Sequence, residues 1–97
     1  MKISISQIQN IVSNVTNISI ELINSPSRKA NIVQARHLSM HFSRWNTQLP
    51  MLKIAKLHNR DNHATIIHAD TCISNDIRKN VRLKEIYNEI ESQIKNF

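Results

Sequence analysis

A chain of 97 residues has room for one domain and little room for a second. It contains 16 Ile and no Gly, so a fold that depends on glycine turns, such as a P-loop or a dinucleotide-binding crossover, is not expected. The net charge is +6, and residues 28–60 hold seven basic side chains and no acidic one, which favours a polyanionic partner.

The first third of the chain predicts a helix, a short helix or turn, and a basic loop. Apolar residues recur at helical spacing from Ile5 to Val15, and Ser4 or Ser6 is the expected N-cap. Residues 18–24 are expected to form the short helix or turn. Residues 25–29 read as a loop because of their Pro and Ser content, and the loop carries Arg28 and Lys29.

The middle of the chain predicts a long helix, a short helix and a tight turn. Asn31 is the expected N-cap of the long helix, which runs to about Trp45. Its expected inner face consists of Ile32, Ala35, Leu38, Ser39 and Phe42. After Pro50, residues 51–57 fit a helix of two turns. In the polar turn that follows, Asn59 is expected to take a left-handed backbone, which Asn tolerates better than most residues other than Gly.

Two more helices are expected, at about residues 62–75 and 79–96. The inward positions of the first are expected to be Ile66, Ile67, Ala69 and Ile73, and in the last helix a 3-4 pattern runs from Val81 to Phe97. The predicted fold is therefore all-α, a compact helical bundle of five to six helices in a single domain over residues 1–97. The pair at about residues 50–75 has the form of a helix-turn-helix.

Three segments resemble the C-terminal DNA-binding domain of the bacterial chromosomal replication initiator DnaA. They are IELINSPSRKANIVQARHLSM at residues 20–40, MLKIA at 51–55 and NRDNHATIIHA at 59–69. The family has a basic loop, a helix start of the form R-x-I/V-x-x-P/A-R-Q/H-x-A/S-M, then L-P-x-I-G and G-G-R-D-H-T-T-V-L-H-A. The last two segments stand at the family spacing without a gap, and the resemblance covers about residues 5–95.

The resemblance implies a mode of binding to double-stranded DNA in replication initiation or its regulation. Arg28 stands where the family inserts an arginine into the minor groove, and residues 62–68 correspond to the helix start that enters the major groove. His63 and Thr65 match a His and a Thr that read base edges and thymine methyls. The expected DNA-binding residues are Arg28, Lys29, Arg36, Arg44, Lys53, Lys56, Arg60, Asp61, Asn62, His63, Ala64, Thr65 and His68. Of these, Arg36, Arg44, Lys53 and Lys56 are expected to hold phosphates, and Lys2 lies outside the expected surface.

The segment at residues 59–69, called the reader segment, departs from the family pattern. Without a gap, Asp61 takes the position of the family's guanine-reading Arg, Asn62 that of its Asp and Ala64 that of its first Thr. An alternative alignment places Arg60 and Asp61 on the Arg-Asp pair and treats Asn62 as an insertion. An Asp side chain has no donor for guanine, so we expect weaker preference for the family's AT-rich nonamer. Arg60 then reads a base or holds a phosphate, and we favour the phosphate.

Other chemistry has little support in the sequence. His37 and His41 are four residues apart but lack the carboxylate of an H-E-x-x-H motif, so no metal or other cofactor is expected. Cys72 has no orienting third group, so the chain is not expected to be an enzyme. With a single cysteine, no Walker motif and no long apolar run, we expect a cytoplasmic, nucleoid-associated protein that binds neither nucleotide nor membrane. Packing of His68 against the core is favoured.

One alternative function stays open. The changed reader segment is also what a protein-interaction module would show if it had kept the fold and lost sequence-specific reading of DNA. Its partner would then bind through Trp45 or through the mixed-charge last helix. Retarded migration of a duplex at low salt separates the two possibilities.

Overall fold

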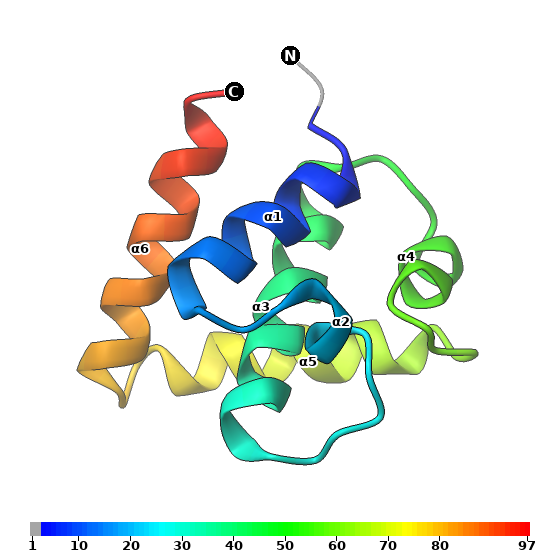
Figure 1. Cartoon of the computed structure of the whole chain (residues 1–97), viewed down its shortest axis with the longest axis horizontal. Helices are drawn as coiled ribbons and strands as arrows, with labels where there is room; N and C mark the ends of the chain where they lie inside the picture. Colours follow the sequence, from blue (N-terminus) through cyan, green and yellow to red (C-terminus); the bar gives the residue numbers. More distant parts are fainter. Residues whose placement is uncertain (1–2) are drawn as a thin grey trace.

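The computed structural model describes residues 3–97, and Lys2 lies outside the described residues. The described part contains six helices and no strands. Figure 1 shows how they are arranged. They are α1 (Ile5–Thr16), α2 (Ile20–Ile23), α3 (Ala30–Asn46), α4 (Met51–Leu57), α5 (Ala64–Asp76) and α6 (Val81–Lys95). The all-α fold class and the helix pair at about residues 50–75 are therefore confirmed.

Local capping signals account for several helix ends. Ser4 caps α1 in a capping box, in which Ser4 Oγ accepts from the Gln7 amide at 3.1 Å and the Gln7 side chain accepts from the Ser4 amide at 2.8 Å. Asn17 ends this helix with a left-handed backbone at φ 61°. Asn59 has φ 60°, which confirms its expected conformation in the turn.

Other helix ends differ from expectation by one or two residues. The N-cap of α3 is Lys29 and not Asn31, which lies in the first turn of the helix. The Ser27 hydroxyl accepts from the Lys29 amide at 3.3 Å, so a hydrogen bond within the loop orients the residue that begins the helix. In the same way, the side chain of Asn80 accepts from the Leu83 amide at 3.0 Å, and α6 begins at Val81.

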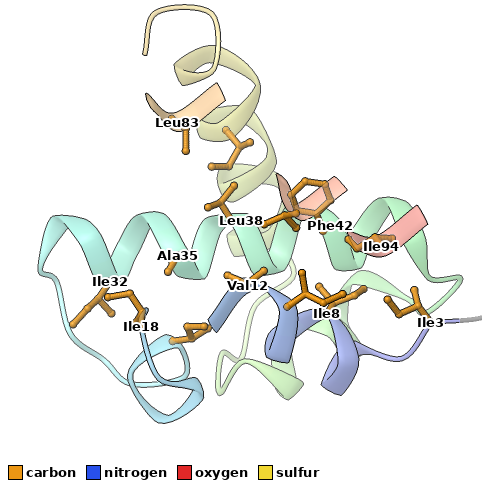
Figure 2. Close-up of a cluster of buried hydrophobic side chains, with 14 residues drawn as sticks. Ile3, Ile8, Val12, Ile18, Ile32, Ala35, Leu38, Phe42, Leu83 and Ile94 are labelled. Carbon is orange, nitrogen blue, oxygen red and sulfur yellow. The ribbon is translucent and has the colours of Figure 1, made fainter. Parts of the chain in front are cut away.

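The main hydrophobic core lies around α3, which packs against α1, α2 and α5 (Figure 2). The five residues expected on the inner face of α3 are all buried. Three inward expectations are wrong: Ile67 is 43% exposed, Val81 is 77% exposed and Phe97 is 39% exposed. Ile67 follows the buried Ile66 and is rotated about 100° from it around the helix, and the first residue of α6 lies beyond the core.

A second, smaller core holds the helix-turn-helix pair. It joins α4 and α5 to α3 and to the start of α1 through a set of buried apolar side chains: Ile5, Met40, Ile54, Ala55, Ile66 and Ala69. Met51 packs against this cluster from its edge. Because both helices of the pair share this core with α3, the beginning of α5 has a fixed direction relative to the long helix.

Candidate nucleic-acid interface

The turn between α4 and α5 presents the first residues of α5 to solvent. The Arg60 amide donates to the Ala55 carbonyl at 2.8 Å, which closes the end of α4. The Asn62 side chain then accepts from the Ala64 amide at 2.8 Å, and Asn62 O accepts from the Thr65 hydroxyl at 2.9 Å. Residues 61–64 are exposed, whereas Thr65 is half-buried.

A buried histidine, His58, holds this turn against the core through hydrogen bonds of both ring nitrogens. The His58 side chain has no solvent exposure, and its Nδ1 lies 2.8 Å from the Ile54 carbonyl. Because a carbonyl can only accept, Nδ1 carries the proton, and Nε2 accepts from the Ser39 hydroxyl at 2.7 Å. Burial lowers the pKa of His58, and the charges of Arg60 and Arg36 act in the same direction. No sequence pattern predicts this contact, since Ser39 is 19 residues away.

The side chain of Arg36, on α3, is hydrogen-bonded to the basic loop and to the residue that ends α2. Its Nε donates to the Ile23 carbonyl at 2.8 Å, and its Nη2 donates to the carbonyls of Ser25 at 2.7 Å and Ser27 at 3.0 Å. Arg36 is only 6% exposed, and burial, together with the charge of Arg60, lowers its pKa. Arg28 and Lys29 extend from the same loop and are exposed.

The basic loop and Asn24, the residue just before it, are also bonded directly to the helix-turn-helix turn. The Asn59 side chain donates to the Asn24 carbonyl at 3.2 Å, and Arg60 Nη2 donates to the Ser25 carbonyl at 2.9 Å. Arg60 Nη1 donates to the His58 carbonyl at 3.0 Å, so one guanidinium spans both segments. The structure therefore brings together a loop and a turn that are 35 residues apart in the sequence.

A hollow of about 310 Å³ lies between α3 and the start of α5. Its lining includes Arg36, Arg60, His37 and His68. Neither arginine is in an ion pair with a carboxylate anywhere in residues 3–97. His68 is exposed and meets the His37 ring edge-on at 5.5 Å, so its expected packing against the core is wrong. Burial, then the neighbouring His68 and Arg36, lower the pKa of His37 to about 4.

Arg44 belongs to a separate polar cluster centred on Asp70. Its Nη1 donates to Asp70 Oδ2 at 3.0 Å, and the other oxygen, Oδ1, accepts from Trp45 Nε1 at 2.8 Å and contacts His41 Nδ1. The His41 Nε2 lies 2.9 Å from the Tyr87 hydroxyl. Trp45 is nevertheless 63% exposed. Asp70 was not singled out from the sequence, because a lone acid on a helix face gives no signal of its partners.

The remaining expected cations lie on α4, where Lys53 and Lys56 are exposed and one helical turn apart. Neither lysine is in an ion pair within the described part of the chain. No helix among residues 3–97 is long and apolar enough to cross a bilayer. Over the same residues, no three His, Cys, Asp or Glu side chains are grouped so that they could hold a metal ion.

The α4–turn–α5 unit, with its left-handed Asn59 and its own small core, defines a helix-turn-helix domain. The chain belongs to the bacterial dnaA protein helix-turn-helix family, whose model matches residues 5–73. This confirms the resemblance seen in the sequence.

Curated relatives extend the match to almost the whole chain. It is 35% identical over 95 residues to the chromosomal replication initiator protein DnaA of two strains of Porphyromonas gingivalis. It is 29% identical over 93 residues to the protein of the same name from Flavobacterium psychrophilum. These alignments cover 98% and 96% of this chain and 20% of each relative, so the chain spans about a fifth of the length of the curated relatives it matches.

Proposed function

We propose that the protein binds double-stranded DNA as a non-catalytic domain, in replication initiation or its regulation. The start of α5 would enter the major groove, and Arg28 of the basic loop would enter the adjacent minor groove. The observation that carries this proposal is the bonded contact between the basic loop and the helix-turn-helix turn through Arg60 and Asn59. Two recognition elements held side by side suit adjacent grooves of one duplex. A protein bound in this way would be found with the nucleoid.

Exposed cations would supply the sequence-independent part of the affinity. Arg28 and Lys29 on the loop and Lys53 and Lys56 on α4 have solvent-exposed side chains without an ion-pair partner in residues 3–97. The guanidinium groups of Arg36 and Arg44 already bond loop carbonyls and Asp70. We therefore assign the phosphate contacts to the three exposed lysines, with Arg28 adding its charge from the minor groove, and give Arg36 and Arg44 the task of orienting the loop and α5.

Base reading would fall to the first turn of α5. The Thr65 hydroxyl is bonded to the Asn62 carbonyl, so we expect its methyl group to meet a thymine methyl. The Asn62 side chain accepts from the Ala64 amide two residues on, a bond that Asp and Asn can both form, and this favours the gapless alignment in which Asn62 stands for the family's Asp. In that alignment Asp61 is the reader with changed chemistry, because it can accept only from a cytosine amino group.

The test is a titration of labelled duplexes with the purified protein at low salt. One duplex carries the family's AT-rich nonamer and the other a scrambled sequence. Arg28→Ala should weaken binding to the nonamer duplex by about 1–3 kcal/mol, because a narrow AT-rich minor groove concentrates negative potential. Lys95→Ala is the control, since Lys95 is exposed at the far end of α6 and should lose little. If neither duplex is bound, the proposal is overturned and a protein-interaction module is favoured. If Arg28→Ala and Lys95→Ala lose equally little affinity, the minor-groove assignment of Arg28 is overturned.

A further inference from the structure

We infer that Arg60 is a positioning residue, which holds the basic loop against the helix-turn-helix turn so that Arg28 and the start of α5 reach their grooves together. The inference rests on the proposed function and goes beyond it, because it gives Arg60 a role other than reading a base or holding a phosphate. It also makes the relative placement of two DNA-reading elements a property of the free protein.

The bonding of the Arg60 guanidinium carries the inference. One terminal nitrogen, Nη1, donates to the His58 carbonyl at 3.0 Å within the turn, and the other, Nη2, donates to the Ser25 carbonyl at 2.9 Å in the loop. The planar fork of an arginine suits such a bridge, whereas a lysine ammonium offers a single point of attachment. Arg60 is half-buried, and its two terminal nitrogens are both directed at protein carbonyls.

Ser25 is the point at which two anchors meet. Its carbonyl accepts from Arg60 at 2.9 Å and from Arg36 at 2.7 Å, so α3 and the turn hold the same loop atom. The two arginines differ in the other carbonyls that they bond. Arg36 also bonds Ile23 and Ser27 and supports the whole loop from α3, whereas Arg60 is the cation that joins the loop to the turn before α5.

The physical benefit is preorganisation. A loop free to move would lose conformational entropy when Arg28 enters a groove, and this cost would weaken binding. A loop already fixed at Ser25 has lost much of that freedom on folding. The binding energy of Arg28 should therefore depend on whether Arg60 is present, although the two side chains would contact different partners.

A double-mutant cycle between Arg28 and Arg60 measures this dependence. In the unmodified protein, Arg28→Ala should weaken binding of the nonamer duplex about tenfold or more, within the 5–150-fold range that corresponds to 1–3 kcal/mol. In the Arg60→Ala background, the same change should weaken binding by less than about twofold, because the loop no longer holds Arg28 in place. If Arg60 contacts DNA directly, Arg28→Ala will have the same effect in both backgrounds, and the inference is overturned.

The conservative variant Arg60→Lys separates charge from geometry. It keeps the positive charge that a phosphate contact needs but loses the two-pronged bridge. It should therefore behave like Arg60→Ala in the cycle. Binding and coupling equal to those of the unmodified protein would show that the charge alone matters and would overturn the inference. The matched control is a second cycle in which Lys95→Ala replaces the Arg60 substitution. In the Lys95→Ala background, Arg28→Ala should weaken binding as much as it does in the unmodified protein.

Amide hydrogen exchange, measured without DNA, distinguishes loss of the loop contact from unfolding of the whole domain. The Ser27 and Lys29 amides are bonded to the hydroxyls of Ser25 and Ser27, at 3.2 Å and 3.3 Å. In Arg60→Ala their hydrogen exchange should be faster, while amides in the middle of α5 should keep their protection. Unchanged exchange at Ser27 and Lys29 would overturn the inference. If the unmodified protein binds no duplex, the proposed function fails, and the exchange result still decides whether Arg60 holds the loop.

Discussion

Ser39 of α3 and His58 of the helix-turn-helix turn form a hydrogen bond of 2.7 Å between Oγ and Nε2, and both side chains are fully buried. The bond needs a neutral imidazole whose Nε2 accepts a hydrogen bond from the hydroxyl. A protonated ring would place a charge in the core and would leave no acceptor for Ser39. The turn is therefore built for the neutral form of His58.

Stability should fall in mild acid. The pKa of His58 is lowered by burial in the folded protein, so the unfolded chain binds the proton more readily, at about pH 6.5. The stabilisation is thus present above pH 6.5 and is lost as the pH falls below it. We expect a smaller free energy of unfolding in urea at pH 5.5 than at pH 7.5.

Variants identify the source of this pH dependence. His58→Gln should lower stability at both pH values but reduce the difference between them, since the titrating group is gone. His37 and His41, whose pKa values burial also lowers, would supply the remaining difference. His63→Gln, at the exposed start of α5, is the control and should keep the full difference. A difference as large in His58→Gln as in the unmodified protein would contradict the assignment.

Asp70 should be important for stability although it was not expected to be functional. Its carboxylate bonds Arg44 and Trp45 and contacts His41, so Asp70→Ala would remove one polar partner from each of three side chains. Because the cluster is partly exposed, we expect a loss of about 2–3 kcal/mol in the free energy of unfolding, below the 3–5 kcal/mol of a fully buried pair. Trp45 fluorescence should change in the same variant. Asp76→Ala, at an exposed site on the same helix, should cost under about 0.5 kcal/mol, and an equal loss in both variants would argue against the cluster.

The salt dependence of DNA binding should reflect four cations that neutralise phosphate charge, three lysines at the backbone and Arg28 in the minor groove. With about 0.9 counterion released per contact, Arg28, Lys29, Lys53 and Lys56 predict a slope of about −3 to −4 for log K against log salt. If Arg36 and Arg44 also held phosphates, the slope would be about −5 or steeper. Titrations of one duplex between low and moderate salt distinguish these cases. A slope near zero with binding retained would contradict the electrostatic interface altogether.

Asp61 should limit both affinity and sequence preference. It is exposed in the turn that precedes α5, where its charge would face the DNA backbone. Asp61→Asn should strengthen binding to all duplexes alike, because it removes a repulsive charge. Asp61→Arg should strengthen binding to the nonamer duplex more than to a scrambled one, because Arg can donate two hydrogen bonds to guanine. If the unmodified protein already prefers the nonamer by about a thousandfold or more, the alignment with an inserted Asn62 is the better one.

Much of the fold could be predicted from the sequence because its signals are local. Helical spacing identifies the inner face of α3, Ser4 caps the helix that starts beside it, and the left-handed backbone of Asn59 is a property of its own turn. Periodicity shows which side of a helix is apolar, but not how far the neighbouring elements cover it. Ile67 and Val81 fit the pattern and are exposed, because no element packs over their positions.

The tasks of the arginines were decided by tertiary structure alone. From the sequence, Arg36, Arg44 and Arg60 are three cations of a basic stretch, all expected to contact DNA. In the fold, Arg36 bonds a carbonyl 13 residues away, Arg44 a carboxylate 26 residues away and Arg60 a carbonyl 35 residues away. A guanidinium group binds whichever acceptor the fold brings within about 3 Å. That choice is made by the packing of α3, α5 and the basic loop, and no local pattern of residues contains it.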